Sequence, residues 1–533
     1  MSFAVPRRLA ATLIALLVTT AVGFAQAPKV GKHYERGDLG FRVKTPADWE
    51  LIPPQPSDPH VLAKFDPEIN KYVQTGPGPG DRIFLSCWLV KFDRRKVEGE
   101  EKAKFQRKPL KDVTEWVLKA GEVEDGSAHK LVEGSGVAFK TAGKVPATEY
   151  QFATPGEDDR TKKRVYAVQY SLAPDLDVAI VFTGPGGKSK WSKYEIVFEA
   201  MAKSFSKIEL AAAGAALGAD APLRERERAK QQAKVDALGA PWRLYETPNY
   251  FVLTPHTDRE FVKELCDRVE AIRTQFEIDY PYEKAKELRE AGAAAQTGTS
   301  DADKRKKEME RKMKEELFGA DPREASRCSV VRVFSDRGAY LGYGAPPQSA
   351  GYWSPMDGEL VMYDDQGGGG RRETWDTLNH EAFHQYIFYL YGNVSPHSWY
   401  NEGTGDFYGA LEYKNKRFTL KANQGRRDEI KAAVQQEKHV PLVDFLRMNQ
   451  AEYYGTNKWD ASGLQNYAQG WSFIYFLRTG AKNFPKNWEP AWEGILEKYF
   501  RVLAMSGDLN QAVTEAFQGI DMDKLEKAWV ASN

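Results

Sequence analysis

Cysteine is scarce in this chain, at three residues in 533. Neither sign of charge is in excess, because the sequence contains 75 Lys plus Arg and 75 Asp plus Glu. The three cysteines (Cys87, Cys266 and Cys328) exclude a disulfide scaffold and a four-cysteine metal cluster, and at least one thiol stays unpaired. A net charge of zero argues against a general nucleic-acid-binding protein. The composition, 42% hydrophobic and 12% aromatic, is that of a globular protein, and the length suggests more than one domain.

Long apolar runs are also missing, except for one near the N-terminus. It covers residues 9–22, and its 14 residues fall short of the roughly 20 that span a bilayer. Arg7 and Arg8 precede it, and Ala25-Gln26-Ala27 follows it as a cleavage site of the small-x-small type. We interpret residues 1–27 as a signal peptide rather than a buried helix or a membrane anchor. The mature chain is expected to have no membrane span and to be exported to the periplasm or the extracellular space.

Residues 28–207 have the pattern of a strand-rich N-terminal α+β domain. The strand signature, apolar and polar residues in alternation or a short apolar run, occurs at 39–45, 165–170 and 178–182. Glycine and proline clusters predict turns or loops at 76–80 and 184–187.

A helix closes this domain, because apolar residues have helical spacing over 193–205. This helix and the opening phrase at 40–49 (GFRVKTPADW) resemble PsbP-like domains. The domain contains no catalytic constellation, so we expect it to have a binding or spacer role.

The composition changes at residues 208–240. An Ala/Gly-rich stretch is followed by alternating arginines and glutamates, which predicts a linker that passes into a polar helix. A second domain then occupies residues 241–533. Its predicted elements are a strand or hairpin at 242–253, an amphipathic helix at 258–276, strands at 329–334 and 358–363, and a charged insertion at about 291–320 with a solvated helix at 304–317.

The second domain contains the pattern His-Glu-x-x-His, from His380 to His384. Residues four apart lie on the same side of a helix, so both imidazoles can reach one metal ion. Glu381 is one step round the helix and can reach the open side of that ion without binding it. Two neutral nitrogen ligands and a carboxylate placed to accept a proton from water are typical of a hydrolytic zinc site.

A third ligand is available in the sequence Asn401-Glu402-Gly-Thr-Gly-Asp406, which places Glu402 18 residues after His384. This spacing and the Asn-Glu-x-x-x-Asp pattern resemble the gluzincins, zinc peptidases that include thermolysin-like and aminopeptidase-like enzymes. The resemblance covers about residues 241–533. It implies that His380, His384 and Glu402 bind one Zn²⁺ ion, and that Asp406 orients one of the two histidines.

The chain offers other candidate residues for this site. The metzincin pattern requires a third histidine six positions after His384, where this chain has Leu390. His397 is an alternative ligand, although a histidine after proline is more often a loop residue. A hydrolytic site also needs a donor for the oxyanion, and Tyr467 is the candidate, with His439 and Tyr454 as weaker ones. The spacing of Tyr467 from neighbouring apolar residues also suits a core position.

The resemblance implies a zincin-like domain with a small mixed sheet, an active-site helix and a mainly helical C-terminal part, so the expected fold class is α+β. In gluzincins the strand before the motif helix, here 358–363, presents an edge to an extended peptide; alternatively, it fills the sheet. The Gly-x-Met-Glu-Asn stretch of gluzincin aminopeptidases is absent, which favours an endopeptidase.

We therefore expect an exported zinc metallopeptidase that acts on peptides or proteins, with Glu381 as general base. The alternative is a catalytically silent zincin fold kept as a binding scaffold at the cell envelope. A polysaccharide-binding protein is a third hypothesis, based only on the 13 tryptophans.

Overall fold

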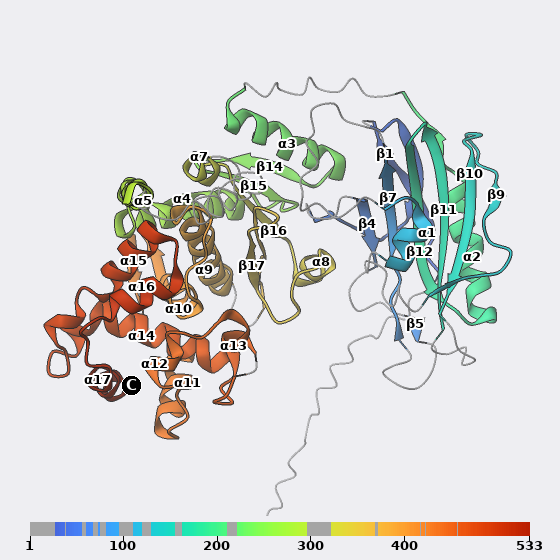
Figure 1. Ribbon diagram of the computed structural model, residues 1–533. Helices are drawn as coiled ribbons and strands as arrows, with labels where there is room; N and C mark the ends of the chain where they lie inside the picture. Colours follow the sequence, from blue (N-terminus) through green and yellow to red (C-terminus); the bar gives the residue numbers. More distant parts are fainter. Residues whose placement is uncertain are drawn as a thin grey trace, which may run out of the picture.

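The computed structural model divides into a strand-rich N-terminal part and a more helical C-terminal part, which confirms the α+β class (Figure 1). It describes residues 27–37, 39–55, 60–67, 73–74, 82–94, 110–119, 129–154, 162–209, 221–295, 321–367, 371–415, 417–421, 423–455 and 457–533. The predictions for residues 1–26, 76–80 and 304–317 fall outside these ranges. No helix within them is long and apolar enough to cross a membrane, and all three cysteines are free.

The N-terminal part is built on an eight-stranded sheet of order β3-β4-β7-β12-β11-β10-β8, with β9 paired to β10, and a three-stranded sheet β1-β2-β13. The strands are β1 (Val30–Arg36), β2 (Phe41–Pro46), β3 (Glu50–Ile52), β4 (Val61–Asp66), β5 (Val73–Gln74), β6 (Arg82–Ile83), β7 (Cys87–Asp93), β8 (Lys130–Leu131), β9 (Val137–Phe139), β10 (Ala147–Ala153), β11 (Lys163–Ala173), β12 (Leu176–Pro185) and β13 (Ser206–Lys207). The predicted turn at 184–187 is wrong for its first two residues, because Gly184 and Pro185 still pair with β11.

Two helices cover opposite faces of the large sheet. Side chains alternate between the faces of a strand. Tyr166, Phe182 and other residues of one face pack against α2 (Lys188–Lys203), the predicted closing helix. Val165 and Val181, one position away on the same strands, pack on the opposite face with α1 (Val113–Lys119).

The C-terminal part begins with α3 (Leu223–Leu238) and a five-stranded sheet of order β14-β15-β16-β18-β17. Its strands are β14 (Arg243–Glu246), β15 (Tyr250–Thr254), β16 (Ser329–Phe334), β17 (Gly351–Ser354) and β18 (Glu359–Tyr363). The three central strands run parallel, and the two outer strands are antiparallel to their neighbours. Of the two alternatives for residues 358–363, the structure shows the second: β18 lies inside the sheet between β16 and β17, and β17 is the edge strand.

Helices cover both faces of this mixed sheet. One face packs against α4 (Arg259–Asp279) and α9 (Arg371–Leu390) through Val252, Val331, Leu360 and their neighbours. The other face packs against α3 and α8 (Arg337–Gly342). Parallel strands buried on both faces have near-continuous apolar sequences, and every residue of β16 and β18 is buried.

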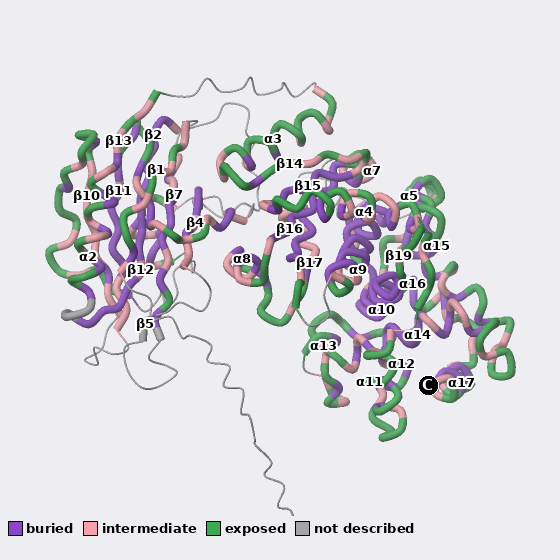
Figure 2. Tube along the Cα trace, turned by 180° about the vertical axis from the view of Figure 1, so that it is seen from behind, coloured by how far each residue is buried: buried purple, intermediate pink, exposed green. Residues whose placement is uncertain are grey.

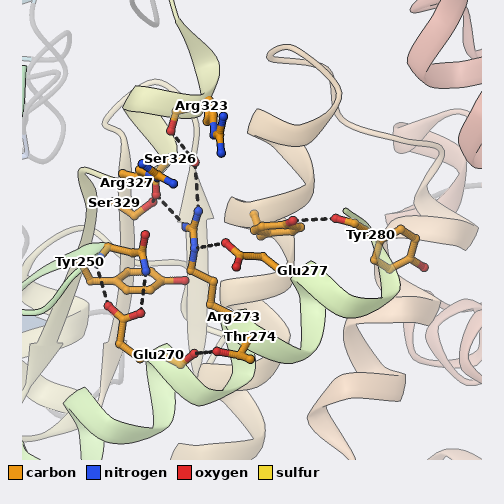
Figure 3. Close-up of polar contacts among 12 residues, drawn as sticks. Tyr250, Glu270, Arg273, Thr274, Glu277, Tyr280, Arg323, Ser326, Arg327 and Ser329 are labelled. Atoms are coloured by element: carbon orange, nitrogen blue, oxygen red, sulfur yellow. Dashed lines mark hydrogen bonds and ion pairs between the residues drawn. The ribbon is translucent and has the colours of Figure 1, made fainter. Parts of the chain in front are cut away.

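The chain re-enters the core after the charged segment at Ser326, the last residue of α7 (Pro322–Ser326). Residues 291–295 of that predicted insertion belong to α5 (Tyr282–Ala295), and 296–320 lie outside the described ranges. The buried Arg273 of α4 donates to the Ser326 carbonyl at 2.8 Å and to Glu277 at 2.9 Å (Figure 3). These bonds attach the returning chain to the helix that supports the sheet.

The remaining chain is mainly helical, as expected. Its elements are α10 (Ser398–Gly409), β19 (Leu411–Lys414), β20 (Arg417–Leu420), α11 (Gln424–Gln435), α12 (Leu442–Phe445), α13 (Gln450–Tyr454), α14 (Gly463–Asn483), a 3₁₀ turn (Pro490–Trp492), α15 (Ile495–Ser506), α16 (Leu509–Ala516) and α17 (Met522–Ser532). Helices α9 and α10 are buried along most of their length (Figure 2). Most side chains of these two helices are therefore shielded from water.

Candidate metal centre

The two motif histidines lie one turn apart on α9, as the spacing predicts. The helix ends at Leu390 and Gly392 has a φ of 70°, a left-handed conformation that glycine adopts without strain. The ring centroids of His380 and His384 are 4.5 Å apart. Both imidazoles thus face the same region next to α10.

Glu402 of α10 lies opposite this pair. Its Oε2 is 3.1 Å from His380 Nε2 and 3.3 Å from His384 Nε2. One ligand atom from each of the three residues lies within 4.8 Å of the others, in the only group of this kind among the described residues. The structure therefore brings together the three residues predicted to bind the metal.

These distances fit a tetrahedral zinc site. With ligand bonds of 2.0–2.2 Å, neighbouring ligand atoms are about 3.4 Å apart. The two nitrogen–oxygen distances, 3.1 and 3.3 Å, are close to this value without rearrangement. The donor set of two imidazoles and one carboxylate also suits zinc, and leaves a fourth position for a non-protein ligand.

The charges of the three residues are strongly coupled. Burial alone would lower the pKa of His380, but hydrogen bonds with Asp406 and Glu402 raise it well above its ordinary value. Burial would raise the pKa of Glu402, but His384 and His380 hold it well below its ordinary value. In the absence of a metal ion, positive charge on the imidazoles thus offsets the buried carboxylate.

Each histidine is oriented through its second nitrogen. Asp406 Oδ1 is 3.1 Å from His380 Nδ1, so of the two histidines it contacts His380. Asn401 Oδ1 is 3.0 Å from His384 Nδ1. This contact was not predicted from the sequence, although Asn401 directly precedes Glu402. Arg426 of α11 in turn donates to Asp406 at 2.7 Å. Such partners fix the tautomer and direction of a ligating imidazole.

Glu381 is buried beside this cluster and next to the edge strand. Burial raises its pKa, and the two histidines act in the opposite direction. The backbone N–H of Trp353 in β17 hydrogen-bonds to it, and a side chain at Gly351 would lie 3.2 Å from its Cγ. Its carboxyl group therefore lies between the three predicted metal ligands and the edge strand of the sheet.

The other candidates have different surroundings. The Tyr467 ring lies 6.4 Å from the His380 ring, with the Arg426 guanidinium 4.8 Å from its centroid, so Tyr467 borders the cluster. The Tyr454 hydroxyl donates to Glu402 Oε1. His397 is the N-cap residue before α10 and contacts the Tyr499 hydroxyl, and His439 pairs with Glu526 at 3.3 Å. The structure gives neither of these two histidines a place in the metal-binding group.

Comparison with known proteins adds little. No protein-family model and no curated protein matches the chain. The chain is similar to PsbP (CyanoP) from Synechocystis sp. PCC 6803, with 13% identity and a TM-score of 0.23 over 36% of this chain and 98% of that one. It is also similar to the Ran-binding protein Mog1p of Saccharomyces cerevisiae, with 10% identity and a TM-score of 0.20 over 33% and 95%. Both likenesses are too weak to indicate the function of this chain. No match supports the gluzincin resemblance, which stays a prediction.

Proposed function

We propose that this protein is an exported, zinc-dependent peptidase that hydrolyses peptide bonds in peptides or proteins, and that it is an endopeptidase rather than an aminopeptidase. The observation that carries the proposal is the convergence of two imidazoles and a carboxylate at spacings of 3.1 and 3.3 Å, with the buried Glu381 beside them. A purely structural site has no need of a further carboxylate next to an open ligand position.

Each residue would have a defined part in the reaction. His380, His384 and Glu402 would hold the zinc ion. When bound, zinc would polarise a carbonyl group and lower the pKa of a water molecule, so that this water can lose a proton near neutral pH and attack the carbonyl carbon. Glu381 would accept the proton of the attacking water and deliver it to the leaving amine. Its raised pKa supports the first half of this role, because the conjugate base of a weaker acid accepts a proton more readily.

The edge strand offers a way to place the substrate. β17 pairs only with β18 among the described strands, and its Trp353 backbone reaches Glu381. An extended peptide could add to this edge through main-chain hydrogen bonds, which do not depend on the substrate's side chains. The scissile carbonyl would then lie beside Glu381. Peptides with free and blocked N-termini would be cleaved alike by an endopeptidase, whereas blocking would stop an aminopeptidase.

The decisive variant is Glu381→Gln. We expect it to keep the wild-type zinc content and to lose roughly 10²- to 10⁴-fold in peptide hydrolysis, the usual contribution of a general base. Zinc content and cleavage of a broad peptide library would be measured on the same samples. The exposed Glu373, on the first turn of the same helix, supplies the matched control Glu373→Gln, which should behave as wild type.

Two outcomes would contradict the proposal. Full hydrolysis by Glu381→Gln would remove Glu381 from the mechanism. A zinc-loaded wild-type protein that cleaves no member of the library would favour the alternative of a silent binding scaffold.

A further inference from the structure

The two oxygens of Glu402 have different partners. Oε2 lies within 3.3 Å of both histidine nitrogens, on the side where a metal ion would bind. Oε1 accepts a hydrogen bond from the Tyr454 hydroxyl. Glu402 is 4% exposed, so no bulk water competes for this second oxygen. The carboxylate is thus divided between a metal side and a tyrosine side.

Tyr454 is held in place by the elements around it. It is the last residue of α13, which starts with a capping box between Asn449 and Glu452. The preceding Tyr453 is fixed to α14 twice: its hydroxyl donates to the Asn466 carbonyl at 3.0 Å, and its carbonyl accepts from Asn466 Nδ2 at 2.8 Å. The backbone that carries Tyr454 is therefore tied to a long buried helix.

The chain that follows α13 adds to this support. Asn457 donates to the carbonyls of Glu452 and Ala461, at 3.0 and 2.8 Å, which closes the connection between α13 and α14. The Tyr454 ring lies 5.9 Å from that of Tyr467 on α14. A hydroxyl on such a framework has little freedom to leave Glu402.

We propose that Tyr454 is a positioning residue that occupies Oε1 of Glu402 and so directs the other oxygen alone to the metal ion. This inference rests on the proposed zinc site. A glutamate that is free to rotate can bind a metal through one oxygen or both, and a hydrogen bond to the outer oxygen selects the first arrangement. Single-oxygen binding keeps the fourth tetrahedral position open for water, as hydrolysis requires.

The inference reassigns a residue that the sequence suggested in another role. An oxyanion donor must direct its hydroxyl at the attacked carbonyl, whereas this hydroxyl is directed at a ligand carboxylate. The two roles differ in what the loss of the hydroxyl changes. A positioning residue affects metal binding before any substrate is present, and an oxyanion donor affects only turnover.

The test is the zinc affinity of Tyr454→Phe, measured on the full mature chain by competition with a chromophoric chelator. Loss of a residue that orients a ligand costs roughly 10- to 100-fold in metal affinity. The ring is kept and is 40% exposed, so the variant should fold, and unfolding curves would confirm this. Tyr475→Phe is the matched control. It also removes a tyrosine hydroxyl, but this hydroxyl belongs to α14 and accepts a hydrogen bond from Asn483 instead of donating one to Glu402.

The outcomes separate this inference from the proposed function. Weakened zinc binding in Tyr454→Phe, with wild-type binding in Tyr475→Phe, would support it. Equal affinity in Tyr454→Phe and wild type would overturn it, and a loss confined to kcat would make Tyr454 an oxyanion donor instead. If wild type itself binds no zinc, the proposed function fails first.

Discussion

Burial shifts the pKa values of single residues in the C-terminal part away from those of exposed residues. His397 is the clearest case outside the metal-binding group. It is the N-cap residue before α10, is 8% exposed and contacts the Tyr499 hydroxyl at 3.1 Å. Burial, with Arg447 nearby, lowers its pKa from 6.5 to about 4. The folded protein therefore keeps this histidine neutral at pH values where an exposed histidine is charged.

This residue should make stability depend on pH. Between pH 6.5 and 4 the unfolded chain binds a proton at His397 that the folded chain does not. The free energy of unfolding is therefore highest above pH 6.5 and falls as the pH is lowered towards 4, by about 3 kcal/mol from this group. In His397→Gln that part of the loss should disappear in denaturant unfolding at pH 7 and pH 4. His33→Gln, at an exposed position, should retain it; an equal loss in both variants would contradict the assignment.

At the scale of elements, the site depends on how closely α10 approaches its neighbours. A Cβ at Gly403 would lie 2.4 Å from the Gly470 carbonyl oxygen of α14. A Cβ at Gly405 would lie 3.0 Å from the His380 ring on α9. Glycine at these two positions lets one helix contact both partners, which places Glu402 against the histidines.

Gly403→Ala should therefore be costly. The added methyl group meets backbone atoms that cannot turn away, so we expect about 1–3 kcal/mol of destabilisation. Zinc affinity should fall as well, because Glu402 is the preceding residue. Gly425→Ala is the control, since a Cβ there meets only Asn423 Oδ1 at an ordinary 3.8 Å. Denaturant unfolding that finds the two variants equally stable would show that the α10–α14 contact is looser than described.

The same elements explain which features could be predicted from the sequence. The ligand pair on α9 depends only on helix periodicity, and Glu402 and Asp406 share a helix face for the same reason. The contacts of Asn401, Arg426 and Tyr454 depend on how α10 packs against α9, α11 and α13, which no local pattern encodes. The order of strands is also non-local. For this reason the apolar run at 358–363 could not show whether it lay at the edge or in the interior.

At the scale of the whole molecule, the N-terminal part contacts the segment that leads to the edge strand. Gln55 donates to the Tyr343 carbonyl at 2.8 Å, and Ile52 packs in the same apolar cluster as Tyr340. The Tyr340 ring in turn lies 6.1 Å from that of Tyr352 in β17. The N-terminal part is thus connected to strand β17, which runs beside Glu381, through the contacts of Tyr340.

The proposed function depends on one zinc ion held by three side chains. The most direct test is a crystal structure of the purified protein with anomalous diffraction recorded on both sides of the zinc absorption edge. We predict one strong peak within bonding distance of His380 Nε2, His384 Nε2 and Glu402 Oε2, with the Tyr454 hydroxyl still bound to the other carboxylate oxygen. A zinc-supplemented crystal with no peak there, or with Glu402 turned away from the ion, would contradict it.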